Sequence, residues 1–251
     1  IIKHADIRRT LMNMKSLIEG QRSCAFWVSQ LIDVSLNHPD KKVKDSATDL
    51  VSLMTPVIKS FFTDIGMEIT NDAIQVFGGY GYTKDQGIEQ LFRDNRITPI
   101  YEGTNSVQAV DLVYRKILNN KIFDKYILQI NEEIKGFMEN KKLSLFVQKF
   151  QKYLELLNNF TMWLGEKNKV SKDDVSSACN DYLKVLGYVA LAHSWLKVLK
   201  ISHEKLDKNK DFYQDKINTA TYYFDKILPR VQSHYISAIS GSETMMKGNF
   251  N

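Results

Sequence analysis

Apolar side chains recur at steps of three and four residues along most of the chain, the spacing that places them on one face of an α-helix. The first such pattern covers 7–32 and stops close to Pro39. The second covers 47–76 and ends at the glycine pair that begins with Gly78. The sequence therefore predicts two long amphipathic helices, one directly after the other.

Two local signals modify this pattern. Pro56 interrupts the second helix, and because proline lacks a backbone N–H, we expect either a kink there or a new helix capped by Thr55. Residues 83–86 read Thr-Lys-Asp-Gln, which matches a capping box. We expect it to open a short helix that carries the apolar residues of 88–92.

A connection rich in lysine and asparagine starts at Asn119 and indicates a domain boundary. Ser171 is a predicted N-cap, since acidic residues that suit a helix N-terminus follow it. No strand-like alternation of useful length is present. We predict an all-α fold of two consecutive antiparallel helix bundles, domains 1–120 and 121–251. Helical patterns in the second domain cover 122–140, 143–164, 171–206 and 211–239.

Composition narrows the class of protein. The chain has 251 residues and is 43% hydrophobic, which supports a substantial core. No apolar run approaches the roughly 18 residues needed to span a bilayer, and 1–10 is charged where a signal peptide would be apolar. The net charge of +5 is spread without a basic block, so we expect a solvated surface rather than nucleic-acid binding. Because the chain starts at Ile1 without a methionine, we interpret it as part of a longer protein.

Cysteine and histidine give no sign of a metal centre. Cys24 and Cys179 lie far apart in the sequence on apolar faces, which is typical of buried thiols in a reducing compartment. The five histidines lack the paired spacing of zinc ligands, so we predict no metal.

A glycine-rich turn is the first candidate for chemistry. Residues 75–83 read QVFGGYGYT, and three glycines within four positions permit positive φ angles and a close approach to phosphates. A P-loop would need a Gly-Lys-Ser/Thr ending, and a dinucleotide fingerprint would need a preceding strand, so both are set aside. Taken alone, the turn favours the interpretation as a helix C-terminus between packed helices.

Glu102 is the second candidate. It is a single carboxylate among apolar residues, followed by Gly103 and then by a helix for which Thr104 or Asn105 is the predicted cap. Such a carboxylate is either a solvated loop charge or a base at the mouth of an apolar site. The carboxylate lies at the N-terminus of that helix, where N–H groups are unpaired, and a glycine turn that could hold a pyrophosphate lies one short helix upstream.

Taken together, these motifs resemble the C-terminal helical domain of acyl-CoA dehydrogenases. The similarity rests on 75–82 (QVFGGYGY), 92–94 (FRD) and 100–104 (IYEGT), in this order and spacing. It extends upstream to 4–9 (HADIRR) and downstream to 108–116 (QAVDLVYRK), which is similar to the long branch of the family with its extra C-terminal helical domain. The family's N-terminal helical domain and middle β-domain are not in this chain, so we expect it to be inactive alone.

The resemblance implies oxidation of an acyl-CoA thioester to trans-2-enoyl-CoA, with FAD accepting hydride from Cβ and electron-transfer flavoprotein reoxidising the flavin. Glu102 matches the base that removes the α-proton. A flavin ribityl hydroxyl and the N–H of Glu102 would stabilise negative charge on the thioester oxygen. Burial beside an apolar acyl chain would desolvate the Glu102 carboxylate and make it a stronger base.

The resemblance also implies roles for neighbouring residues. The expected FAD contacts, the first three made across a dimer interface, are Gln75, Gly78, Gly79, Thr104 and Ser106. The expected substrate contacts are Tyr101 and Gly103. Arg93 and Asp94 are expected to form a structural ion pair.

Two other functions remain open. An acyl-CoA oxidase shares the fold and the glutamate but lets oxygen reach the reduced flavin. A non-catalytic helical module, in which 121–251 mediates subunit contacts, would retain the motifs as relics. As partners we expect acyl-CoA, electron-transfer flavoprotein and a second copy of the chain, in a homodimer or a dimer of dimers. The expected location is the bacterial cytoplasm, or the mitochondrial matrix in a eukaryote, and the acyl group is undetermined.

Overall fold

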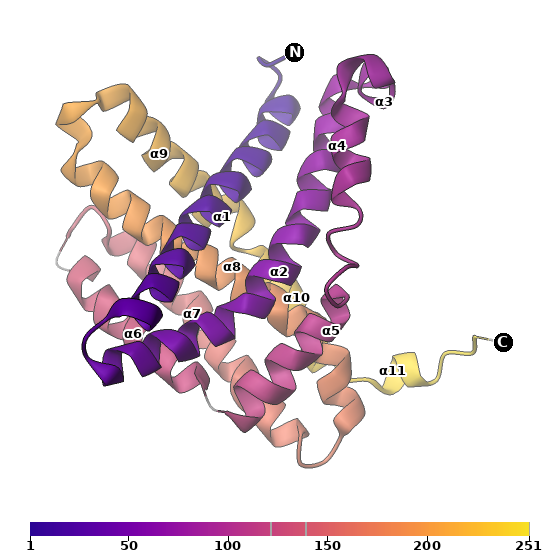
Figure 1. Ribbon diagram of the computed structural model, residues 1–251. Helices are drawn as coiled ribbons and strands as arrows, with labels where there is room; N and C mark the ends of the chain where they lie inside the picture. Colours follow the sequence, from indigo (N-terminus) through magenta and orange to yellow (C-terminus); the bar gives the residue numbers. More distant parts are fainter. Residues whose placement is uncertain (121, 139, 251) are drawn as a thin grey trace.

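The computed structural model describes residues 1–120, 122–138 and 140–250, and within them every regular element is helical, which confirms the all-α prediction. Helices α1 (Ala5–Asn37) and α2 (Lys41–Phe77) form a long antiparallel hairpin (Figure 1). Asp40 caps α2, and its side chain accepts hydrogen bonds from the backbone N–H groups of Lys42 and Val43.

Helix α2 continues through Pro56, so the predicted new start capped by Thr55 is wrong. The Thr55 hydroxyl instead donates to the carbonyl oxygen of Val51, one turn back along the same helix, at 2.7 Å. Figure 1 shows α2 changing direction along its length, as expected of a helix that contains an internal proline. The alternative prediction, a kink, therefore describes this helix.

Three short elements follow α2: α3 (Gly79–Tyr82), the 3₁₀ turn η1 (Lys84–Gln86) and α4 (Ile88–Asn95). The predicted capping box is wrong, because the Thr83 hydroxyl donates to the carbonyl oxygen of Tyr80 instead of capping the next helix. The left-handed residue Gly87 (φ 68°) separates η1 from α4. Helix α5 (Asn105–Val110) then continues directly into the π-helical segment η2 (Asp111–Asn119).

Most of the later helices lie where their periodicity predicts. They are α6 (Ile122–Met138), α7 (Ser144–Lys167) and α8 (Lys172–Glu204), the last capped by Ser171 as expected. The helical pattern at 211–239 is confirmed, but it is divided near Pro229 into several helical segments. It forms α9 (Lys210–Tyr222), the π-helical turn η4 (Tyr223–Ile227) and α10 (Arg230–Ile239), after η3 (Leu206–Lys208) and before α11 (Glu243–Met246).

Helix α8 is the centre of the molecule. Every residue of 185–196 is buried, so this stretch has no solvent-facing side. It packs against α1 and α2 of the first half and against α7, α9 and α10 of the second. The two halves therefore share one hydrophobic core. The division into domains 1–120 and 121–251 stays a prediction, and residues 121, 139 and 251 of the second domain lie outside the described residues.

Gly187 lets α8 cross α2 closely, because a Cβ atom built on it would lie 2.5 Å from the Phe61 ring. We expect Gly187→Ala to lower the free energy of unfolding by about 1–3 kcal/mol through overpacking. Gly136→Ala in α6 is the control, since its Cβ would meet no atom within 4 Å. That variant should be neutral or stabilising by up to about 1 kcal/mol. Urea denaturation of both variants measures the difference, and equal effects would contradict the close crossing.

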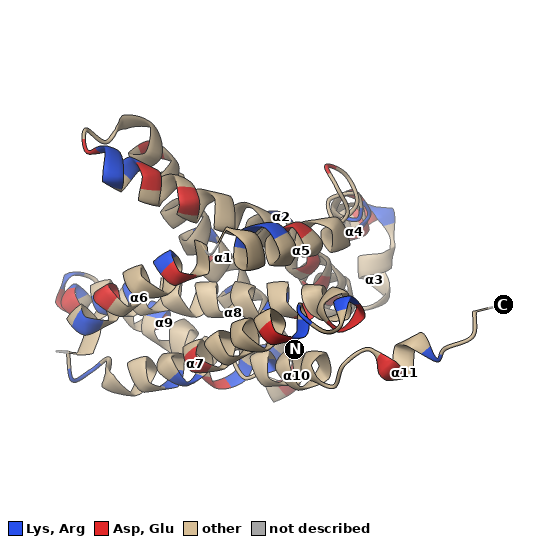
Figure 2. Ribbon diagram, turned by 90° about the horizontal axis from the view of Figure 1, so that it is seen from below, with Lys and Arg blue, Asp and Glu red and all other residues tan. Residues whose placement is uncertain are grey.

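The surface and the thiols agree with the composition. Lys and Arg are interspersed with Asp and Glu over the helices in Figure 2. Both cysteines are free and buried, and burial raises the pKa of each thiol to about 12.

Among the described residues, no group of three or more His, Cys, Asp or Glu side chains could hold a metal ion. Among the helices that the structure describes, α2 is the one long and apolar enough to cross a membrane, by length and composition only. In the fold, 44% of its most apolar window is buried.

Candidate active site

The loop at 99–104 is the last part of the connection between α4 and α5, and it is held against the middle of α2. The ammonium group of Lys59 donates to the carbonyl oxygen of Gly103 at 2.6 Å and to Oδ1 of Asn105 at 2.9 Å. The side-chain amide of Asn105 donates to the carbonyl oxygen of Ser60 at 3.1 Å and to Oδ1 of Asp64 at 2.7 Å. One face of α2 thus fixes both the end of the loop and the first residue of α5.

Glu102 adopts an unusual backbone conformation. Its φ is 54°, and it is the one non-glycine residue with positive φ in the part of the chain that the structure describes. Left-handed backbone at such a residue costs on the order of 1–3 kcal/mol and is typical of functional sites. Gly103 follows with φ 87°, where a side chain would be strained. The Gln108 side chain donates to the carbonyl oxygen of Glu102 at 3.1 Å, which adds a second tether to the strained residue.

The predicted substrate residues surround this strained position. Tyr101, Glu102 and Gly103 are all exposed on the outer side of the loop. Apolar side chains are exposed beside them, with Ile100 at 45% and Val107 at 58% of their accessible area. The carboxylate therefore lies in an exposed apolar surface, the setting expected of a base whose apolar substrate lies against it.

The start of α5 carries the second set of predicted cofactor contacts. Thr104 is the N-cap, and its hydroxyl accepts from the backbone N–H of Val107, so the predicted cap is confirmed. Ser106 is exposed, and its hydroxyl accepts a long hydrogen bond of 3.5 Å from the Asn180 side chain of α8. Thr104 and Ser106 thus lie at the start of α5, directly after Glu102 in the chain.

The glycine turn lies at the far end of α2. Gln75, Gly78 and Gly79 are exposed there, and a Cβ built on either glycine would meet no atom within 4 Å. Gly81, by contrast, is buried against the last turn of α2, where a Cβ would lie 2.7 Å from the carbonyl oxygen of Ile74. The backbone of the turn is therefore open to solvent at Gly78 and Gly79, while the buried Gly81 packs it against the end of α2.

The structure does not bring the two predicted regions into one cluster. Asp64 holds the Glu102 loop, and Gly78 lies fourteen residues further along the same helix. At about 1.5 Å per residue, this places the glycine turn roughly 20 Å from the loop. A single small ligand on one chain cannot contact both regions, whereas an elongated ligand or two copies of the chain could. The roles assigned to these residues stay predictions.

Sequence reasoning missed one contact and misassigned another. Nothing in the helical pattern distinguishes Lys59 from an ordinary surface lysine, because its partners lie more than forty residues away. Arg93 pairs with Glu89 at 2.5 Å, so the expected pair with Asp94 is wrong. One helical turn places Glu89 beside Arg93, whereas adjacent residues point in different directions. The hydrogen bond raises the pKa of Arg93 and lowers that of Glu89.

Two family models match the chain and leave only a short connection between them. The model described as "Acyl-CoA dehydrogenase, C-terminal domain" matches 1–118. The model described as "Acetyl-CoA dehydrogenase C-terminal like" matches 130–248.

Similar proteins are known from several organisms. The 3-methylmercaptopropionyl-CoA dehydrogenase of Ruegeria pomeroyi is 37% identical over 120 residues, which cover 48% of this chain and 20% of that protein. A butyryl-CoA dehydrogenase of Syntrophomonas wolfei is 26% identical over 244 residues, which cover 92% of this chain and 39% of that protein. This chain therefore spans at most about two fifths of the length of these relatives.

Two solved structures share the fold. Caenorhabditis elegans ACDH-11 in complex with C11-CoA has a TM-score of 0.75 and 20% identity, and the match covers 99% of this chain and 41% of that one. An acyl-CoA dehydrogenase from Bacillus anthracis complexed with FAD has a TM-score of 0.73 and 14% identity, with 100% and 44% covered. At these identities the likeness concerns the arrangement of the helices alone.

Proposed function

The chain belongs to the acyl-CoA dehydrogenase family, and from this premise we propose that it is the C-terminal part of an FAD-dependent enzyme that oxidises an acyl-CoA thioester to the trans-2-enoyl-CoA. The observation that carries the proposal is the strained, exposed Glu102, held by α2 in an apolar surface. The relatives named above are dehydrogenases of acyl-CoA thioesters, which supports the same substrate class for this chain.

The chain's own residues fit an elongated flavin cofactor. The open backbone at Gly78 and Gly79, with Gln75 beside it, suits a pyrophosphate, and the hydroxyls of Thr104 and Ser106 offer further hydrogen bonds at the other end. A solved relative of the same fold binds FAD, which supports this assignment. When bound, FAD supplies the acceptor for the hydride that leaves Cβ.

Glu102 has the role of base in this proposal. Its carboxylate takes the proton from Cα, while the electron pair of that C–H bond becomes part of the new Cα=Cβ double bond. The backbone N–H of Glu102 donates to the thioester oxygen and stabilises the negative charge that develops there. Because the loop holds the carboxylate and this N–H on one residue, a single backbone conformation positions both groups.

The wider assignments rest on the same premise. We propose that electron-transfer flavoprotein takes up the electrons and that the enzyme is a homodimer or a dimer of dimers. The exposed aromatic rings of Tyr80 (74%) and Tyr82 (82%) beside the glycine turn suit burial against a second subunit. The proposed location is the bacterial cytoplasm, or the mitochondrial matrix in a eukaryote.

Anaerobic mixing of the whole protein with short-chain acyl-CoA thioesters tests the function. We expect the purified protein to be yellow and its flavin absorbance to bleach. Peroxide formation in air at the rate of substrate oxidation would indicate an acyl-CoA oxidase instead. A colourless protein that gains no flavin on incubation with FAD would favour the non-catalytic helical module.

We also expect the 251-residue chain alone to bind FAD weakly and to oxidise no acyl-CoA. It supplies pyrophosphate contacts on an open surface, where hydrogen bonds compete with water and add little affinity. A titration followed by flavin fluorescence measures this binding. Submicromolar affinity would contradict the expectation and would mean that these helices alone enclose the flavin.

A further inference from the structure

A cavity lies away from the residues assigned to the flavin and the thioester. Its volume is about 290 Å³, and α1, α8 and α9 line it. Apolar side chains form most of its wall: Trp195, Val198 and Ile201 of α8 and Phe212 of α9. In Figure 1, α9 lies on one side of α1, whereas α3, α4 and α5 lie on the other. The cavity shares no lining residue with either candidate region.

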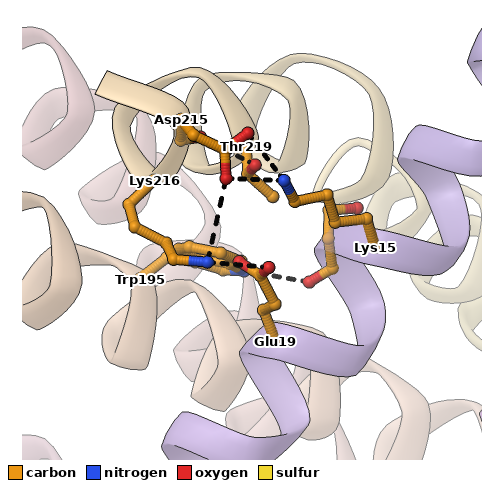
Figure 3. A network of polar contacts seen from close by, with 7 residues as sticks. Lys15, Glu19, Trp195, Asp215, Lys216 and Thr219 are labelled. Atoms are coloured by element: carbon orange, nitrogen blue, oxygen red, sulfur yellow. Dashed lines mark hydrogen bonds and ion pairs between the residues drawn. The ribbon is translucent and has the colours of Figure 1, made fainter. Parts of the chain in front are cut away.

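The wall is fixed by a network of ion pairs and hydrogen bonds (Figure 3). Lys216 of α9 donates to Oε1 of Glu19 at 2.8 Å, and Lys15 contacts the Asp215 carboxylate at 2.6 Å. The Trp195 indole N–H donates to the carbonyl oxygen of Ser16 at 3.2 Å, which holds the ring in the wall. These contacts link α1 to α8 and α9, so the cavity is a formed feature of the fold.

Two polar groups of the cavity wall lack partners. Oε2 of Glu19 is buried and accepts no hydrogen bond, although Oε1 of the same carboxylate is paired with Lys216. Arg22 is exposed and has no ion pair among the described residues. The two residues are three positions apart on α1, which separates their Cβ atoms by roughly 5–6 Å. A buried oxygen without a donor is unfavourable, so the site favours a ligand that brings one.

We propose that this cavity binds an apolar α-amino acid. The ammonium group of the ligand donates to Oε2 of Glu19, its carboxylate accepts from the guanidinium of Arg22, and its side chain packs against Trp195 and Phe212. A fatty or aryl acid has no ammonium group and would leave Oε2 unpaired. A simple amine has no carboxylate for Arg22 and would place a second cation beside it. The cavity volume is near the lower end of the range for ligand sites, roughly 300–1,000 Å³, so the cavity is too small for a coenzyme. This site goes beyond the proposed acyl-CoA oxidation.

Three probes with the same ring but different head groups test the ligand class by calorimetric titration of the chain. They are L-phenylalanine, 3-phenylpropanoate and 2-phenylethylamine. We expect L-phenylalanine to bind with saturation and to change Trp195 fluorescence. Each one-headed analogue should bind at least about tenfold more weakly, because it loses one charge-assisted hydrogen bond. Equal or tighter binding of 3-phenylpropanoate, or no binding of L-phenylalanine, overturns the proposal.

Matched variants test the two head-group contacts. Arg22→Gln and Glu19→Gln should each weaken L-phenylalanine binding by about tenfold, and the glutamine at 19 can still accept from Lys216. Arg8→Gln, an exposed arginine on the same helix outside this cavity, is the control and should bind as wild type does. Val198→Phe should abolish binding by filling the cavity. Unchanged affinity in Arg22→Gln, or an equal loss in Arg8→Gln, overturns the assignment.

Discussion

Replacing Glu102 with Gln in the whole enzyme should slow flavin reduction by about 10³-fold or more. Glutamine is nearly isosteric with glutamate and keeps the backbone N–H that polarises the thioester, but it cannot accept the α-proton. General-base catalysis contributes typically about 10²–10⁴-fold, and in an enclosed site no water takes over the role. Anaerobic stopped-flow bleaching of the flavin with excess acyl-CoA measures the rate.

FAD content and acyl-CoA affinity should be unchanged in Glu102→Gln, and a binding titration run beside the kinetics provides that control. Glu89→Gln is a second control, because it removes an acidic side chain from the neighbouring helix α4 without touching the 99–104 loop. Reduction by Glu102→Gln within about tenfold of wild type would show that another carboxylate is the base.

The helices and their simple caps could be predicted because their determinants are local. Residues 7–32 and 171–206 have an apolar period of three to four that one helix satisfies, and Thr104 and Ser171 cap through their own N3 amides. The same reasoning failed at the predicted capping box, where nearby residues make competing interactions. The Thr83 hydroxyl bonds to Tyr80, and Gly87 with its positive φ sets the start of α4 in place of the capping box.

Long-range features could not be predicted in this way. Helix α8 is buried on all sides over 185–196, so this stretch lacks the polar face that would reveal its neighbours. The periodicity of 211–239 continues across Pro229, although the backbone passes through the π-helical turn η4 just before that proline. At the candidate site, the motif identifies Glu102 and Gly103, while the tether from Lys59 depends on how α2 packs against the loop.

Lys59 is therefore expected to position the base. It does not touch Glu102 itself, but it binds the carbonyl oxygen of the next residue and the side chain of Asn105, the first residue of α5. The Glu102 backbone has φ 54°, a conformation that relaxes unless its neighbours hold it. Removing the ammonium group should let the loop move toward an unstrained conformation and displace the carboxylate from Cα.

We expect Lys59→Met in the whole enzyme to lower kcat by about 10²-fold with little change in KM, since a displacement of about 1 Å can have such an effect on the chemical step. Lys59→Arg should recover part of the rate, because it can still donate to the Gly103 carbonyl. Lys116→Met is the matched control: Lys116 also binds α2, through the Ser52 hydroxyl at 2.8 Å, without contacting the loop. Its kcat should stay close to wild type. Loss of a lysine with a purely structural role would lower thermal stability in either Met variant, without a selective effect on kcat. A selective fall in kcat for Lys59→Met therefore identifies a positioning role. A kcat of this variant within threefold of wild type would contradict it.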